Sequence, residues 1–231
     1  MTNFTDDRRN FTAQVGNFLK TVIILIMLSG LVGVFIQERK SDLKKASQHL
    51  ISSIYGSPPL VMEGGNPYIR ALMRTISASE SNYLNPYHVI YTGKYVKDLS
   101  KHPNICVTIV NGPNEGRCTT ASGRYQFLNT TWEEKASLYH PQPSKFFVWK
   151  DYSFEPEYQD KVVYNWLTDS NAWSEDITNL LENGNIDRVL KLLSPTWTSL
   201  GYGIEDNNMT RHLPQIYHKL LKEELDKGIN N

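Results

Sequence analysis

The sequence lacks a net charge, because 24 lysine and arginine residues balance 24 aspartate and glutamate residues among its 231. This balance gives no electrostatic reason to expect a nucleic acid as partner, and we predict none. Internal repeats and low-complexity tracts are also missing, which excludes a repeat architecture. With 40% hydrophobic and 11% aromatic residues, the composition suits one ordinary domain with an appendage.

Cysteine is scarce, since only Cys106 and Cys118 occur. No His/Cys quartet surrounds them, so a zinc site is not expected, and we predict neither a metal nor a cofactor. The two cysteines flank the turn signal Asn111-Gly112 and can face each other across two strands. In an oxidising compartment they would close this hairpin as a structural disulfide, whereas in a reducing cytosol they would be free thiols.

One long hydrophobic run is present, between Lys20 and Glu38. Its 17 residues, 21–37, are at the short end of what crosses a bilayer as a helix. No small-residue cleavage site follows the run and no cysteine offers a lipidation site, so we expect an uncleaved signal anchor. A cleaved signal peptide and a buried core helix are the alternatives. Basic residues flank the run on both sides, so the positive-inside rule does not settle its orientation.

The composition therefore divides the chain into four segments. Residues 1–20 are expected to be a polar cytoplasmic tail and residues 21–37 a transmembrane signal anchor. Residues 38–66 contain Gly- and Pro-rich stretches and are expected to be a linker. Residues 67–231 are expected to form the folded domain.

Glu80 occupies an unusual place in that domain. A helix is predicted to start at Asn66 and Pro67, and its apolar residues recur at helical spacing on one face, namely Ile69, Leu72, Met73 and Ile76. Glu80 takes the next position on this face. A carboxyl group there is partly desolvated, which should raise its pKa and fit it for general acid catalysis near neutral pH. A surface glutamate in a fraying last turn is the alternative interpretation.

Downstream patterns predict a small hairpin followed by helices. Strands are expected at 87–93 and 105–110, and a helix is expected to begin within 123–126. Further helices are predicted over 154–166, 177–181, 186–193 and 216–225, the last of them charged and peripheral. Trp132 and Trp197 fall on apolar faces and are expected in the core.

Several of these segments match one family in the same order along the chain. They are Ser79-Glu80, Tyr87-His88-Val89-Ile90, His102-Pro103, Gly123-Arg124-Tyr125-Gln126, residues 156–160 and residues 193–200. Together they resemble the phage lambda endolysin type of lytic transglycosylase, over roughly the last two thirds of the chain. The resemblance implies an α+β fold, a mostly helical lysozyme-like domain with a small inserted β-hairpin, here preceded by one N-terminal transmembrane helix.

The resemblance also implies the chemistry. Between Ser81 and Gly93 there is no Asp or Glu, where a hydrolytic lysozyme normally supplies its second carboxylate. Lytic transglycosylases use a single Glu, here Glu80. It protonates the glycosidic oxygen between MurNAc and GlcNAc, then takes the proton of the muramic acid 6-hydroxyl, and a 1,6-anhydro-MurNAc end results. Because the nucleophile is intramolecular, its positioning replaces the second carboxylate.

The other matched residues are expected to have lesser roles. Tyr125 and Gln126 are candidates for holding the oxocarbenium-like sugar or its acetamido group; alternatively, Tyr125 packs in the core and Gln126 caps a helix. Tyr87, His102 and Ser81 complete the candidate substrate-binding set, although a His before Pro is more often structural. Arg124 is expected to brace the fold through an ion pair.

The substrate would be peptidoglycan glycan strands, which lie outside the inner membrane. We therefore expect a single-pass inner-membrane protein with a periplasmic catalytic domain, acting in local cell-wall remodelling, with a secretion or conjugation apparatus as a candidate partner. A signal-anchor phage endolysin, a hydrolytic muramidase or chitinase, and a non-catalytic glycan-binding scaffold remain alternatives. Ser81 and His88 depart from the family pattern, which has Gly and an acidic residue there, and this leaves room for the scaffold.

Overall fold

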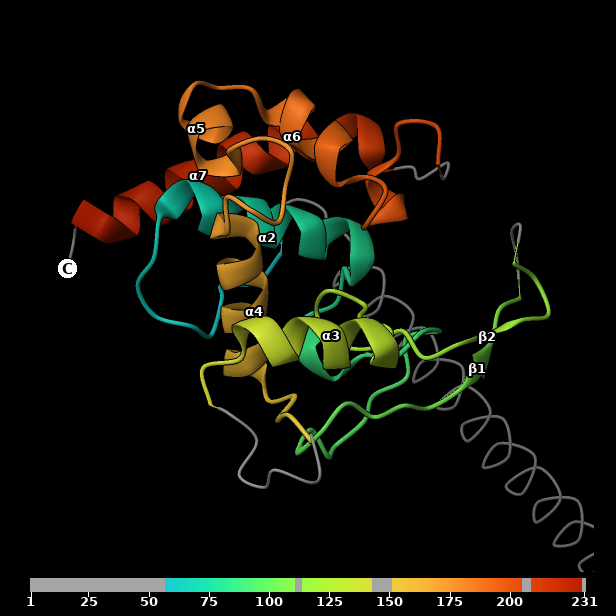
Figure 1. The fold of residues 1–231 in the computed structure, drawn as a ribbon. Coiled ribbons are helices and arrows are strands. Elements are labelled where there is room, and N and C mark those ends of the chain that lie inside the picture. Colours follow the sequence, from blue (N-terminus) through green and yellow to red (C-terminus); the bar gives the residue numbers. More distant parts are fainter. Residues whose placement is uncertain (1–56, 111–113, 143–150, 205–208, 230–231) are drawn as a thin grey trace, which may run out of the picture. The chain divides into compact units, whose positions relative to one another are not determined.

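The computed structural model describes residues 57–110, 114–142, 151–204 and 209–229 (Figure 1). The predicted tail, the hydrophobic run 21–37, most of the predicted linker and the turn Asn111-Gly112 lie outside the described residues. Within the described part of the chain, none of the helices combines the length and the apolar character needed to cross a membrane.

The described chain is mostly helical and carries one small antiparallel sheet, as predicted. Its helices are α2 (Pro67–Glu80), α3 (Asn129–Tyr139), α4 (Pro156–Thr168), α5 (Ile177–Glu182), α6 (Ile186–Leu193) and α7 (Leu213–Ile229). Three 3-10 turns are η1 (Pro86–His88), η2 (Thr198–Leu200) and η3 (Thr210–His212). The strands β1 (Val107–Thr108) and β2 (Cys118–Thr119) pair with Val107 opposite Thr119.

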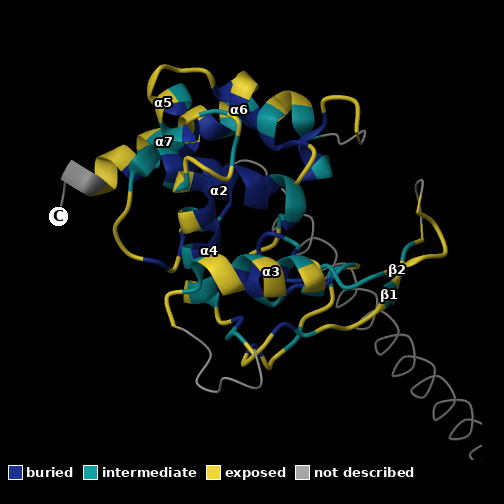
Figure 2. Ribbon diagram, in the orientation of Figure 1, coloured by how far each residue is buried: buried dark blue, intermediate teal, exposed yellow. Residues whose placement is uncertain are grey.

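Helix α2 is the centre of the core. The Asn66 side chain accepts a hydrogen bond from the Tyr68 amide at 2.8 Å, and Pro67 supplies the first helical residue. The predicted apolar face is completely buried, and Figure 2 shows α2 as largely dark blue. Helices α4, α5 and α7 pack against it. Trp132 and Trp197 are buried, as predicted.

Helix α7 is not peripheral, contrary to the prediction from its charged sequence. Leu213, Tyr217 and Leu220 recur at i, i+4 and i+7 and are buried against α2. One charge of α7 is neutralised within this interface, because the buried Glu224 carboxylate accepts hydrogen bonds from Arg70 and Arg74 of α2, each at 2.7 Å. Helix α7 is therefore part of the core, although its charged sequence suggested an exposed helix, because its apolar residues line one face and the charges beside them are paired.

The last part of the predicted linker is folded onto the domain. Ser57, Leu60 and Met62 are buried. The Ser57 carbonyl accepts from the Arg74 guanidinium at 2.8 and 3.1 Å, and the Asp160 carboxylate accepts from the Val61 and Met62 amides at 2.8 and 3.2 Å. The folded unit therefore begins before Pro67.

The segment 123–126 is a turn, and α3 begins only at Asn129. The predicted helix start is wrong because Gly123 and Gln126 have positive φ values of 76° and 48°, which no right-handed helix contains. Likewise, only short pieces of the strand predicted at 87–93 exist. Residues 86–88 form η1, and single bridges join Val89 to Tyr95 and Ile90 to Ser122.

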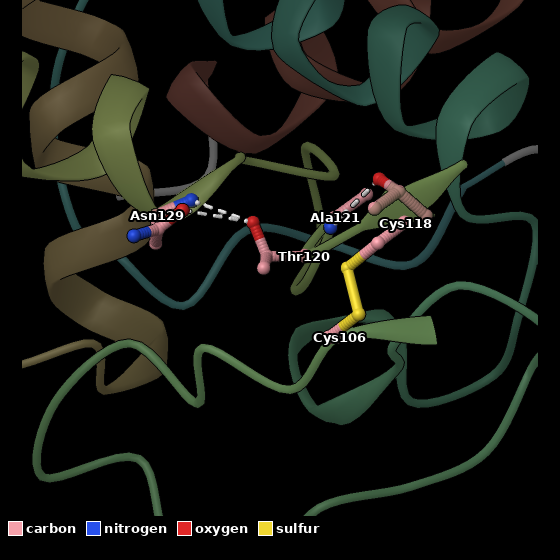
Figure 3. Close-up of a disulfide and its surroundings, with 6 residues drawn as sticks. Cys106, Cys118, Thr120, Ala121 and Asn129 are labelled. Carbon is pink, nitrogen blue, oxygen red and sulfur yellow. Dashed lines mark hydrogen bonds between the residues drawn. A yellow bond between two sulfur atoms is a disulfide. The ribbon is translucent and has the colours of Figure 1, made fainter. Parts of the chain in front are cut away.

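The hairpin carries the disulfide Cys106–Cys118, with the two Cα atoms 5.5 Å apart (Figure 3). The pairing predicted for an oxidising compartment is thus present in the structure. Next to it, the Thr120 hydroxyl accepts from the Asn129 amide at 3.1 Å and donates to the Asn129 side-chain oxygen at 3.0 Å. These bonds join the hairpin to the start of α3, as the close-up shows.

Candidate functional site

Glu80 is the last residue of α2 and is partly buried. The helix ends there because Ser81, at φ −144°, leaves the helical conformation while its amide still bonds the Ser77 carbonyl. One carboxyl oxygen of Glu80 accepts a hydrogen bond from the Ser199 hydroxyl at 2.5 Å. Glu80 therefore lies at a partly desolvated helix end, as predicted. The raised pKa of Glu80 stays a prediction.

The hydroxyl of Ser199 contacts this carboxyl group, and the hydroxyl of Ser79 contacts Ser199. The Ser199 oxygen lies 3.0 Å from the Ser79 hydroxyl oxygen, and the Ser79 hydroxyl donates to the Ile76 carbonyl at 2.9 Å. Neither serine was singled out from the sequence, although Ser79 adjoins Glu80 and Ser199 lies in the matched segment 193–200. Hydroxyls on a carboxylate matter chemically because a hydrogen bond to the charged form stabilises that form.

Core packing brings Ser199 next to Glu80, although the two residues are 119 positions apart in the sequence. Ser199 belongs to η2, which contacts α2. Its neighbours Trp197 and Leu200 are buried, and the Trp197 indole donates to the Tyr125 carbonyl at 3.3 Å. The position of Ser199 is therefore determined by the apolar core.

Ser81 lies beneath the site. It is 1% exposed, and its hydroxyl donates to the Arg124 carbonyl at 2.6 Å. This bond fixes the end of α2 against the turn 123–126. The hydroxyl expected to contact sugar is thus used inside the protein.

Tyr125 lies in the core, in agreement with the alternative interpretation of that residue. It is 1% exposed, and its hydroxyl donates to Asp160 at 2.7 Å. Gln126 is partly buried, and its side-chain amide donates to the Gly123 and Val89 carbonyls at 2.9 and 3.3 Å. Gln126 therefore stabilises the turn and does not cap α3. It is the candidate of the pair with partial access to solvent.

Tyr87 shares Asp160 with Tyr125. The Tyr87 hydroxyl donates to the other Asp160 oxygen at 2.7 Å and accepts from Arg124 at 2.8 Å. Burial, with a further contribution from the Asp160 charge, raises the pKa of both tyrosines well above the ordinary value, although the Arg124 charge acts in the opposite direction. Both hydroxyls therefore stay protonated and donate to the carboxylate.

Arg124 and Asp160 hold this buried network together. Arg124 is fully buried and donates to the Pro58 and Pro59 carbonyls at 2.5 and 3.0 Å, so it braces the fold through hydrogen bonds where an ion pair had been expected. Asp160 was not identified as a key residue from the sequence. The signal was available, because Asp160 lies three and seven residues before the buried Val163 and Leu167 on one face of α4.

His102 has the structural role favoured for a His before Pro. One ring nitrogen, Nδ1, accepts from the Asn104 amide at 3.1 Å, so Nε2 carries the hydrogen and donates to the Phe127 carbonyl at 2.8 Å. Burial lowers the pKa of His102, although the Phe127 carbonyl favours the charged form. The ring is therefore neutral near pH 7.

The structure thus joins Glu80 to Ser199 and, through Ser199, to Ser79, while Tyr87 and Tyr125 are joined to Asp160. No group of three or more potential metal ligands occurs among the residues that the structure describes. The arrangement at Glu80 can donate and accept a proton at one carboxyl group.

One comparison with a solved structure supports the lysozyme-like architecture. Bacteriophage lambda lysozyme complexed with a chitohexasaccharide matches with 23% identity and a TM-score of 0.50, over 69% of this chain and 97% of that one. Lysozyme from bacteriophage lambda matches with 23% identity and a TM-score of 0.47, over 71% of this chain and 97% of that one. At this identity the likeness concerns the fold. No curated protein sequence gives a match.

The Endolysin family gives the assignment, because its model matches residues 70–222, which is most of the chain and includes Glu80, the disulfide, Asp160 and Ser199. The chain therefore belongs to the Endolysin family, as a lysozyme-like protein of the peptidoglycan-degrading class.

Proposed function

We propose that the protein is a lytic transglycosylase that cleaves the MurNAc–GlcNAc bond with Glu80 as the sole acid/base. The observation that carries this proposal is the partly buried carboxyl group at the end of α2, hydrogen-bonded at 2.5 Å to Ser199. The absence of Asp and Glu between Ser81 and Gly93 supports the single-carboxylate mechanism. The next acids along the chain, Asp98 and Glu115, are both exposed.

The reaction needs one proton donor that becomes an acceptor. Glu80 gives its proton to the glycosidic oxygen, and the bond from that oxygen to the anomeric carbon breaks. The Glu80 carboxylate then removes the proton of the muramic acid 6-hydroxyl. At the same time, the oxygen of that hydroxyl forms a bond to the anomeric carbon. Glu80 returns to the protonated state, the product ends in 1,6-anhydro-MurNAc, and no water is consumed. Because the attacking oxygen belongs to the same sugar, its proximity supplies much of the rate.

For substrate contact we favour Gln126 among the five candidates, since it is only partly buried. It belongs to the turn 123–126, which the Ser81 hydroxyl joins to the end of α2. Ser81, Tyr87, Tyr125 and His102 would then act from within the protein by fixing this turn and its surroundings. A protein of similar fold, bacteriophage lambda lysozyme, is complexed with a chitohexasaccharide, which supports a glycan strand as the ligand here.

Residues 21–37 would anchor the protein in the inner membrane, with the enzyme domain in the periplasm. The 17-residue uncharged run and the disulfide, which persists in oxidising compartments, support this location. Tethering favours local remodelling, for instance beside a secretion or conjugation apparatus. If induced cells instead lyse and the protein leaves the membrane pellet, the signal-anchor endolysin is the better description.

The proposal is tested by mass spectrometry of sacculi digested with the full-length protein. We expect anhydro-muropeptides, which are lighter by one water than hydrolysis products. Glu80→Gln should abolish them, and the matched variant Glu115→Gln, at an exposed carboxylate of the hairpin, should keep the wild-type rate. Reducing ends would indicate a muramidase. No product at any pH, with binding to sacculi retained, would indicate the scaffold, which the departures at Ser81 and His88 favour.

A further inference from the structure

We propose that Ser199 is a positioning residue for Glu80. Its hydroxyl, braced by Ser79, holds one carboxyl oxygen of Glu80 so that the other oxygen exchanges the proton with the sugar. This inference rests on the proposed role of Glu80. It adds to the site a second residue, which is 119 positions away from Glu80 in the sequence.

The geometry defines the direction of each hydrogen bond. A serine hydroxyl has one hydrogen and two lone pairs. The Ser79 hydrogen is used on the Ile76 carbonyl at 2.9 Å, so the Ser79 oxygen can act as an acceptor. Ser199 then has two acceptors within reach, Glu80 at 2.5 Å and Ser79 at 3.0 Å. When Glu80 is ionised, the charge-assisted bond to Glu80 is the stronger choice.

The same three groups also suit the protonated carboxyl group. If the proton is on the Glu80 oxygen that does not face Ser199, the other oxygen still accepts from Ser199. If the proton is on the oxygen next to Ser199, Glu80 donates to Ser199, and the Ser199 hydrogen turns to Ser79. In neither state is a hydroxyl hydrogen left without an acceptor, and no heavy atom has to move. The carboxyl group can thus act first as acid and then as base from one position.

Positioning matters here because Glu80 is the last residue of α2 and is only partly buried. Ser199 itself is well fixed, since it is 8% exposed and lies between the buried Trp197 and Leu200. Its carbonyl accepts from the Thr210 hydroxyl at 3.5 Å. Gly201, with φ 92°, turns the chain directly after η2. A hydrogen-bond donor in a fixed position reduces the number of orientations that the Glu80 side chain can take.

The test compares full-length variants by steady-state kinetics on sacculi. We expect Ser199→Ala to lower kcat by about 10- to 100-fold, the cost of a misplaced catalytic group, while KM changes by less than about 2-fold, since Ser199 is not placed against the sugar. Ser199→Thr retains the hydroxyl and should recover most of the lost rate. Ser79→Ala removes only the brace and should lower kcat less than Ser199→Ala does.

Ser194→Ala is the matched control. Ser194, the residue directly after α6, is also buried, but its hydroxyl donates to the Lys191 carbonyl in the last turn of that helix at 2.8 Å. It should leave kcat unchanged. Combined with Glu80→Gln, the Ser199→Ala change should cause no further loss. Wild-type kcat in Ser199→Ala, or an equal loss in Ser194→Ala, overturns the inference. An active Glu80→Gln variant overturns the proposed function instead, so the two failures are distinguishable.

Discussion

Replacing Asp160 with Asn should destabilise the domain strongly, although the two side chains have nearly the same shape. Asp160 is completely buried on α4. It accepts hydrogen bonds from the hydroxyls of Tyr87 and Tyr125, each at 2.7 Å, and from the amides of Val61 and Met62 at 2.8 and 3.2 Å. An asparagine offers only one oxygen and presents an NH2 group to donors that surround the other position.

The magnitude follows from the number of bonds. A hydrogen bond to a charged acceptor contributes about 1.5–3 kcal/mol and a neutral one about 0.5–1.5 kcal/mol, so each of the four loses about 1 kcal/mol. The Met62 bond is long and contributes least. The expected loss is therefore about 3–4 kcal/mol, a large part of the roughly 5–15 kcal/mol that stabilises a typical domain.

Urea unfolding at pH 7, followed by tryptophan fluorescence, measures this loss. With an m value of about 2 kcal/mol per M, the midpoint should fall by about 1.5–2 M. Asp98→Asn is the control, because that exposed carboxylate accepts only a local bond from the Ser100 amide at 2.9 Å and should leave the midpoint unchanged. A midpoint for Asp160→Asn within about 0.5 M of wild type would refute the hydrogen-bond account.

Two further predictions concern the packing around α2 and the turn beside the site. Burial acts to raise the pKa of Glu224, but Arg70 holds this pKa below its ordinary value of 4.5. The stabilisation that ionised Glu224 contributes is therefore present above pH 4.5 and is lost as the pH falls through the lower folded pKa. Glu224→Gln should therefore flatten the acid limb of a thermal-denaturation profile below about pH 4.5. An acid limb that is equally steep in Glu224→Gln would contradict this. Gly123→Ala should cost about 2–4 kcal/mol, because the new Cβ meets Gln159 and Phe154 at a positive φ. Gly184→Ala has the same φ of 76° in open space and should cost only about 1–2 kcal/mol, so equal losses would show that the backbone strain alone matters.

The helical part of the fold could be predicted from the sequence because its apolar residues repeat with the helical period. Helix α6 has the predicted bounds, Ile186–Leu193, and α5 differs by a single residue. The pairing of Cys106 with Cys118 was also foreseen, since both positions flank one turn. Strand β1 lies within the strand predicted at 105–110, but the bounds of the two short strands could not be predicted in this way. With two residues each, they are defined by contacts with the rest of the domain and contain too few residues for an alternating pattern.

The sequence by itself determined where the proposed catalytic acid lies, because Glu80 interrupts an apolar helical face at a point that the local pattern defines. Only the tertiary structure decided which groups surround that acid. Ser199 is 119 positions away along the chain, and no local pattern specifies such a contact. The same holds for Tyr87 and Tyr125, whose residue type suits a sugar site or a core equally well. Their burial against Asp160 became known only once the helices were packed, because a hydrogen bond between distant segments depends on the fold of the whole domain.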